Sequence, residues 1–372
     1  MPVATNETLP PQLVGLVEQQ AEGQVQLPTG YAMPFVASSD VPERTIDDWV
    51  KVVKEQWPRE EVDRVLAEHG AILLRGLPVE SADDFSRLLH AFGWTAHVDL
   101  GNPVNRVIHA PNVANANEGP PSLYIAAHSE FGISTHFPSR ICFWALAAPE
   151  EGGETPINSA AWLAKRLKEE APEFVEELLK KDVRYTIYHP PTKLSNDANG
   201  NGVLAAWGST VLPEDDEATT KAKVEAEIQR VSPTTTWEWQ PDGGLFTFQR
   251  TPAFRHHPIL NVPVVFNNLA SYYGGAVNRG TLEAPYLDAT GFYKPPPLYG
   301  DDSPIPLKYL DLVERIIQEN RTLIKWEKGD VFIIDNLAAQ HSRLPWQKGT
   351  RRILASLWDC GLQDLASKVE SF

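Results

Sequence analysis

The sequence contains little cysteine, and this indicates the redox compartment of the protein. Two cysteines in 372 residues cannot form the disulfide framework of a small secreted protein. Cys142 and Cys360 each lie in an apolar run, where a thiol behaves as a small hydrophobic residue. We therefore expect a protein of a reducing compartment, the cytoplasm.

Positive charge and long apolar runs are also scarce. The chain has 33 Lys and Arg against 49 Asp and Glu, a formal net charge of −16. Such a chain repels phosphate backbones and anionic lipid surfaces, so we expect no nucleic-acid partner and no membrane partner. The longest apolar run, Ile141–Ala148, is far shorter than the ~20 residues that span a bilayer. No secretory signal is recognisable in residues 1–20. These features leave a homo-oligomer open.

The chain divides into an arm and one domain. Residues 1–44 are rich in Pro, Gln and Thr without a clear period, which predicts an arm that drapes over a neighbour or stays mobile. Residues 45–372 predict a single domain, since barrels and sandwiches often exceed ~200 residues. Within it, residues 192–235 are polar and acidic, and we interpret them as an insertion at the rim with a helix over Glu217–Val231.

Strand patterns dominate after Gly101, while helix patterns flank them. Helices are predicted from Ile46, over Arg59–Glu68 up to Gly70, from Ser81 to Phe92, over Ala160–Lys181 and over Leu307–Asn320. Runs of β-branched and aromatic residues between turn residues predict strands at residues 71–75, 106–109, 139–147, 183–188, 245–248, 262–266, 331–334 and 352–358. Strands separated by turns indicate a sandwich or a barrel.

A histidine and a glutamate stand two positions apart, at His128 and Glu130. In an extended chain, residues i and i+2 point to the same face, so one strand end can present both groups to a single metal ion. A His-x-Glu triplet is weak evidence alone, because it occurs by chance in many chains. A third ligand is available in His341, which follows the apolar run that ends at Asp335-Asn336. Two imidazoles and one carboxylate leave three positions of an octahedral ion open, as in non-haem Fe(II) oxygenases.

Two adjacent arginines follow the distal histidine. A guanidinium at Arg352, the first residue of a predicted strand, could clasp the distal carboxylate of a dicarboxylate. Arg351 points to the opposite face of such a strand, so only one of the two faces the interior.

Taken in order, these residues resemble the taurine dioxygenase and clavaminate synthase-like superfamily of Fe(II)- and 2-oxoglutarate-dependent oxygenases. The iron motif of that family, His-x-Asp/Glu followed by a distal His, falls on His128, Glu130 and His341. Glutamate in place of the commoner aspartate is shared with clavaminate synthase-like members. Any carboxylate here argues against a halogenase, in which Ala or Gly frees a position for chloride.

The resemblance extends to the 2-oxoglutarate site. The Gly-Gly-x-Thr turn of the family matches residues 152–155, which assigns Thr155 to 2-oxoglutarate. The 2-oxoglutarate arginine of the family falls on Arg352 and favours its inward orientation. Arg250, Arg255 and Asn267 are candidate contacts for an anionic substrate, because they flank a family-like stretch expected near the iron.

The resemblance implies a mainly β fold with flanking α-helices, namely a double-stranded β-helix of the jelly-roll, cupin-like type. It also implies a dioxygenase that uses Fe(II), 2-oxoglutarate and O2 to oxidise a C–H bond and releases succinate and CO2. We expect hydroxylation of a small carboxylate- or amino-acid-type substrate. The alternatives are oxidative cyclisation or desaturation with the same cofactors, a zinc hydrolase built on the same ligands, and a ligand-binding relative without catalysis.

Overall fold

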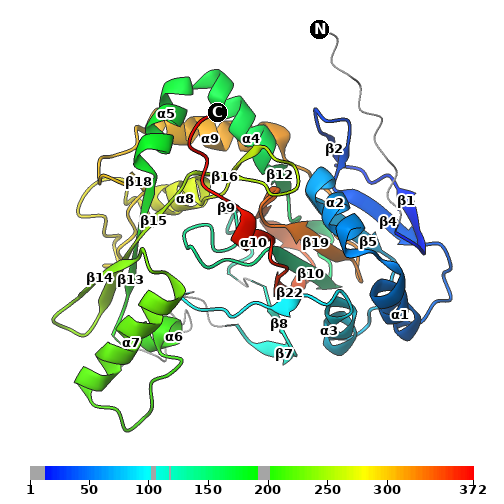
Figure 1. Cartoon of the computed structure of the whole chain (residues 1–372), viewed down its shortest axis with the longest axis horizontal. Helices are drawn as coiled ribbons and strands as arrows, with labels where there is room; N and C mark the ends of the chain where they lie inside the picture. The colour runs from blue at the N-terminus through cyan, green and yellow to red at the C-terminus, as the bar shows by residue number, and fades with distance from the viewer. Residues whose placement is uncertain (1–12, 102–105, 117–118, 192–201) are drawn as a thin grey trace.

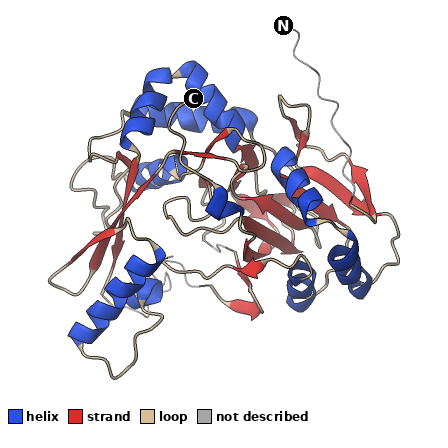
Figure 2. Cartoon of the chain, viewed as in Figure 1, coloured by secondary structure: helices blue, strands red, loops and turns tan. Residues whose placement is uncertain are grey.

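The computed structural model describes residues 13–101, 106–116, 119–191 and 202–372. A large β-sheet lies near the middle of the molecule, and helices gather on its outside (Figures 1 and 2). The prediction of a mainly β fold with flanking helices is confirmed. Within the described part of the chain, every helix is too short or too polar to cross a membrane.

The main sheet has nine strands, of which β6 pairs with β22 and the other eight follow one continuous path. In spatial order these are β1 Leu16–Gln19, β4 Phe35–Ser39, β5 Ala71–Arg75, β19 Val331–Asp335, β10 Arg140–Ala147, β22 Arg352–Asp359, β8 Val113–Asn115 and β7 Ile108–Ala110, with β6 at Thr95–Ala96. The central strands β19, β10 and β22 are buried almost throughout. Such continuous apolar runs suit strands that are covered on both faces.

A smaller sheet carries the residues of greatest interest. Its central strand β20, Ala339–Arg343, pairs with β12, Ile157–Ser159, on one side and with β9, Ile125–His128, on the other. A hydrophobic cluster joins Ile157 and Ala339 of this sheet to Ile141, Phe143 and other residues of the main sheet. Part of the space between the two sheets is therefore a packed core.

The N-terminal segment belongs to this fold. Strand β4 pairs in parallel with β5, and β1 pairs with β4, so residues 16–39 extend the main sheet. This differs from the predicted separate arm over residues 1–44, because backbone pairing supplies the regularity that the side-chain pattern lacks. Residues 1–12 lie outside the described residues.

Three helices cover the outer face of the main sheet. They are α1 Ile46–Gln56, α2 Arg59–His69 and α3 Ala82–His90. Ser81 and Asp84 cap α3 reciprocally, as the sequence predicted, and Gly70 ends α2 in the left-handed conformation. The buried side chains of these helices pack with those of β5 and β19 in one hydrophobic cluster.

A second helical layer lies against the small sheet and its neighbours. It contains α4 Ala160–Glu170, α5 Pro172–Lys181, α8 Leu269–Arg279 and α9 Leu307–Asn320. The predicted helix over Ala160–Lys181 is divided at Ala171-Pro172, because proline lacks the N–H that would continue the helical hydrogen bonds. Helix α8 was not predicted, since its Gly274-Gly275 pair disfavours helix in the sequence pattern.

A four-stranded sheet carries the predicted insertion. The sheet runs β14 Thr236–Trp239, β15 Leu245–Thr251, β13 Val183–His189 and β18 Leu298–Tyr299. Helices α6, Val203–Trp207, and α7, Glu217–Val231, pack with Leu245 and lie beside this sheet at the lower left of Figure 1. The predicted helix over Glu217–Val231 is confirmed. Residues 192–201 of the insertion lie outside the described residues.

The remaining described elements are short. They are β2 Val25–Gln26, β3 Ala32–Met33, β11 Glu151–Gly152, β16 Phe254–His256, β17 Pro263–Val265, β21 Trp346–Lys348 and α10 Leu362–Leu365.

Candidate active site

Two histidines from distant parts of the chain lie opposite each other in the small sheet. His128 ends β9, and its Cα partner in the antiparallel register is His341 of β20. Directly opposed residues of an antiparallel pair project to the same face of the sheet. The two imidazole rings accordingly lie 4.2 Å apart, centroid to centroid.

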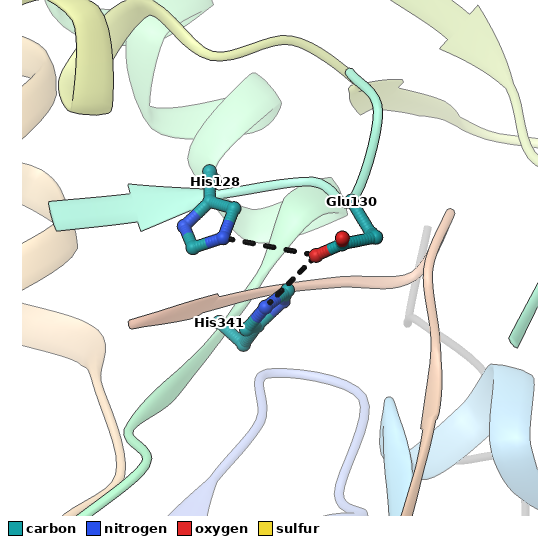
Figure 3. Close-up of side chains that lie close together, drawn as sticks. All are labelled: His128, Glu130 and His341. Carbon is teal, nitrogen blue, oxygen red and sulfur yellow. Dashed lines mark ion pairs between the residues drawn. The ribbon is translucent and has the colours of Figure 1, made fainter. Parts of the chain in front are cut away.

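Glu130 completes this group from the turn that follows β9. Figure 3 shows its carboxylate directed toward both imidazoles. The Oε2 atom lies 3.9 Å from Nε2 of His128 and 3.6 Å from Nε2 of His341. One ligand atom from each of the three residues lies within 4.8 Å of the others. The predicted convergence of His128, Glu130 and His341 is therefore present in the structure.

The hydrogen bond of one ring and the burial of the other suit metal binding. Nδ1 of His128 donates to the carbonyl oxygen of Ala126 at 3.0 Å, which leaves Nε2 as the atom with a free lone pair. Burial, followed by the nearby charges of His128 and Arg106, lowers the pKa of His341 well below its usual value. A neutral imidazole is the form that binds a metal. Two nitrogens and one carboxylate oxygen fit Fe(II), with three positions left open.

Glu130 is held at both its backbone and its side chain. The backbone N–H of Glu130 donates to Oδ1 of Asn336 at 2.8 Å, and its carbonyl oxygen accepts from Nδ2 of Asn336 at 2.9 Å. Nη2 of Arg106 donates to Oε1 of Glu130 at 2.8 Å. The turn that carries Glu130 is thus fixed to Asn336, which directly follows β19.

A cavity of about 220 Å³ opens beside the three residues. Three arginines line it, Arg106, Arg343 and Arg351, whereas Glu130 is the one acidic side chain among its described lining residues. Apolar walls come from residues such as Ile141, Phe143 and Phe131. Although the whole chain is acidic, this cavity is locally cationic and favours anionic small molecules.

Arg351, which lines this cavity, pairs with Thr155, which lies outside the described lining. Nη2 of Arg351 donates to Oγ1 of Thr155 at 3.1 Å, and its Nε donates to the carbonyl oxygen of Gly153 at 2.8 Å. Trp326 also donates to Oγ1 of Thr155, at 3.1 Å. Burial, with Arg343 nearby, lowers the pKa of Arg351 to about 10, so the guanidinium stays charged at neutral pH.

The prediction that Arg352 faces inward is wrong. Arg352 is exposed, whereas its neighbour Arg351 is half-buried and lines the cavity. Between His341 and Arg352 the chain passes through β21, and the pairing of β21 with β11 is irregular. The number of residues after His341 therefore does not fix which of the two arginines faces the cavity.

The three predicted substrate contacts also lie elsewhere. Arg250 is exposed on β15, 3.8 Å from Asp302. Arg255 stacks over Phe137 and Phe266 and donates to the carbonyl oxygen of Ala366.

Asn267 is buried and donates to the carbonyl oxygen of Ala253, which is a structural contact. None of the three lines the cavity, because the alternation of strand residues and the packing of the turn direct them away from it.

Other residues line the cavity that the sequence did not single out. Asn268, next to the predicted Asn267, lines it and accepts from the backbone N–H of Ser129. Gln249 of β15 lines it with its side chain buried, and its Oε1 has no hydrogen-bond partner within the described residues. Trp207 of α6 brings the insertion to the cavity wall. No local motif marks these positions, since they meet only in the fold.

The combination of fold and site defines a class of protein. Two β-sheets enclose a cavity in which two imidazoles and one carboxylate can bind a metal ion. These three ligands occupy one face of the octahedron around the ion and leave its other three positions open. This arrangement is characteristic of non-haem Fe(II) oxygenases.

Comparison with known proteins gives the family. Residues 31–358 match the Taurine catabolism dioxygenase TauD, TfdA family, and the chain belongs to this family. It is 32% identical over 326 residues to a clavaminate synthase-like protein of Arabidopsis thaliana, covering 87% of this chain and 91% of that protein. It is 28% identical over 309 residues to the dapdiamide synthesis protein DdaC of Enterobacter agglomerans, covering 82% of this chain and 87% of that protein.

A solved structure supports the fold. The PvcB protein from Pseudomonas aeruginosa matches with a TM-score of 0.50 and 14% identity, over 98% of this chain and 96% of that chain. The predicted jelly-roll fold class is confirmed. The chain is a dioxygenase that depends on Fe(II) and 2-oxoglutarate, so the predicted enzyme class and cofactors are confirmed. The zinc-hydrolase and binding-only alternatives find no support in these comparisons.

Proposed function

We propose that the chain hydroxylates a C–H bond of a small carboxylate- or amino-acid-type substrate in the cytoplasm. His128, Glu130 and His341 hold the metal, while Arg351 and Thr155 hold 2-oxoglutarate. The observation that carries this proposal is the position of Arg351, which borders the same cavity as the triad and contacts Thr155 at 3.1 Å. A cation and a hydroxyl placed together can hold the far carboxylate of a keto diacid.

The side chains prepare this site in defined ways. The carbonyl oxygen of Ala126 orients His128, Asn336 fixes the backbone of Glu130, and burial keeps His341 neutral. Bound Fe(II) supplies the chemistry that couples oxidative decarboxylation of 2-oxoglutarate by O2 to oxidation of a substrate C–H bond, with release of succinate and CO2. The apolar walls of the cavity exclude water from the reacting groups.

The cavity supports the substrate class. Of the three arginines in its described lining, Arg351 is assigned to 2-oxoglutarate and Arg106 pairs with Glu130, so Arg343 is the cation that favours a substrate carboxylate. Gln249 adds a buried carboxamide whose Oε1 has no partner within the described residues. An unpaired buried acceptor costs about 1–3 kcal/mol, which a substrate N–H would offset. A molecule with both a carboxylate and an N–H, such as an amino acid or an amide derivative, suits both features.

The relatives favour a second candidate reaction. One is named for dapdiamide synthesis and another is clavaminate synthase-like. With the same cofactors, the chain would then cyclise or desaturate its substrate in a biosynthetic pathway. The mass of the product separates the two reactions, because hydroxylation adds one oxygen whereas cyclisation or desaturation removes two hydrogens.

The test has two stages. Anaerobic titration should first show binding of Fe(II) and then of 2-oxoglutarate to the wild-type protein. Small carboxylic acids, amino acids and their amides are then screened for succinate release that depends on the added compound. Absence of Fe(II) and 2-oxoglutarate binding would contradict the proposed site, and release stimulated only by compounds without a carboxylate would contradict the proposed substrate class. His128→Ala is the control, because it should release no succinate with any compound.

A further inference from the structure

The two carboxylate oxygens of Glu130 have different surroundings. Oε2 lies 3.9 Å from Nε2 of His128 and 3.6 Å from Nε2 of His341, as Figure 3 shows. Oε1 instead accepts a charge-assisted hydrogen bond from Nη2 of Arg106 at 2.8 Å. One oxygen is therefore available to a metal held by the histidines, and the other is engaged by a cation.

One side chain donates to this buried carboxylate. Asn336 fixes the backbone of Glu130 on both sides, but its hydrogen bonds within the described residues do not reach the carboxylate. Among the hydrogen bonds of the described residues, the bond from Arg106 is the one that the carboxylate accepts from another side chain. Arg106 is itself held from the other side, since Oδ2 of Asp99 lies 3.8 Å from its Nε. Its side chain is 18% exposed, so solvent screens this contact only partly.

We propose that Arg106 is a positioning residue that keeps Glu130 a one-oxygen metal ligand. The inference rests on the metal site of the proposed function. A carboxylate can bind an ion through one oxygen or through both. With one oxygen from Glu130 and two imidazole nitrogens, a six-coordinate ion keeps three open positions.

Two-oxygen binding by Glu130 would leave two open positions. A keto acid that chelates the ion occupies two, so the third is the one left for a further small molecule. By engaging Oε1, Arg106 preserves this third position. The residue acts through Glu130 and has no direct role in the reaction.

The test counts open positions without requiring turnover. Mn(II) is added to the protein in the absence of 2-oxoglutarate, and the relaxation of water protons is measured per bound ion. Bound Mn(II) relaxes solvent protons through the waters that fill its open positions. Arg106→Met should lower this relaxation by about a third, because three open positions become two. Arg106→Lys, which keeps a cation, should remain near the wild-type value.

Asp99→Asn is the matched control, because it removes the other carboxylate beside Arg106 and leaves the bond to Glu130. It should match the wild type. Wild-type relaxation per bound ion in a folded Arg106→Met protein would overturn the inference. If that variant does not fold, Arg106→Gln provides the same measurement with a neutral side chain. A wild-type protein that binds no Mn(II) would instead contradict the proposed metal site, so the two failures are distinguishable.

Discussion

His128 and His341 are register partners across the antiparallel strands β9 and β20, although one precedes and the other follows most of the domain. Their relative position is set by backbone hydrogen bonds, because directly opposed residues must project to the same face. Any slip of one residue between these strands would turn one imidazole to the other face. The metal site therefore depends on the register of a sheet of only three strands.

The first prediction concerns these two histidines. His128→Ala or His341→Ala should abolish Fe(II) binding and substrate-linked succinate production, since two remaining ligands hold the ion weakly. Anaerobic Fe(II) titration measures the first effect and succinate assay the second. His136→Ala is a suitable control, because His136 lies outside the triad and its Nε2 donates to the carbonyl oxygen of Val98. Full turnover in either triad variant would contradict the site.

The second prediction separates the adjacent arginines. Arg351→Ala should raise the 2-oxoglutarate concentration needed for half-maximal binding about ten- to a hundredfold, the usual range for hydrogen bonds to a charged group. Arg352→Ala should change it by less than about twofold, because its side chain is exposed. Isothermal titration with 2-oxoglutarate and Mn(II) measures both. The opposite ranking would restore Arg352 to the role that the sequence predicted.

The third prediction concerns a buried ion pair behind the site. Arg140 and Asp335 are both fully buried, with Nη1 of Arg140 2.8 Å from Oδ2 of Asp335. Arg140→Met removes one partner of this buried pair and leaves Asp335 buried, which should lower the free energy of unfolding by about 3–5 kcal/mol. Lys165→Met is the control, because its ion pair with Glu169 is exposed and should contribute at most about 1 kcal/mol. Urea denaturation measures both variants, and equal effects would contradict the argument.

The same pair predicts a pH dependence of stability. Burial raises the pKa of Asp335, but the charges of Arg140 and His257 lower it by more than burial raises it. The pKa of Asp335 therefore lies below its ordinary value of 3.8. A carboxyl with a depressed folded pKa stabilises the protein above its unfolded pKa and loses that contribution as the pH falls toward the folded value. The wild type should therefore lose stability below about pH 4, and Arg140→Met should lose less over the same range. Denaturation curves recorded from pH 6 to pH 3 test this.

The fourth prediction concerns contact between the insertion and the cavity wall. Gly101 has a φ of +73°, and a Cβ atom there would lie 2.5 Å from Cη2 of Trp207. Gly93 has a φ of +70°, and among the described residues no heavy atom beyond its chain neighbours lies within 4 Å of such a Cβ. Gly93→Ala should cost about 1–2 kcal/mol from backbone strain alone. Gly101→Ala should cost about 1–3 kcal/mol more, because Trp207 must move. Urea denaturation measures the free energy of unfolding of both variants. Equal losses for Gly93→Ala and Gly101→Ala would contradict the prediction, because Trp207 would then move at no energetic cost.

Local patterns predicted much of the fold and the metal ligands. Helix α9 and the helix of the insertion begin and end where the side-chain period indicated, because apolar spacing and caps are properties of neighbouring residues. The strands β1 and β4 were missed, since their regularity comes from pairing with distant backbone. Helix α8 was missed because tertiary packing of its buried face outweighs the low helix propensity of its glycines.

The amino-acid order alone determined which chemical groups are available, namely two imidazoles, one carboxylate and a cation beside a Gly-Gly-x-Thr turn. It also determined the strand and helix patterns that carry them, because these depend on residues close in the chain. The tertiary structure alone decided that Arg351 faces the cavity and that Gln249 and Trp207 line it. It also decided that Arg106 contacts Glu130. The physical reason is that strand register and contacts between distant segments set side-chain direction, and neither of these is encoded in a local spacing.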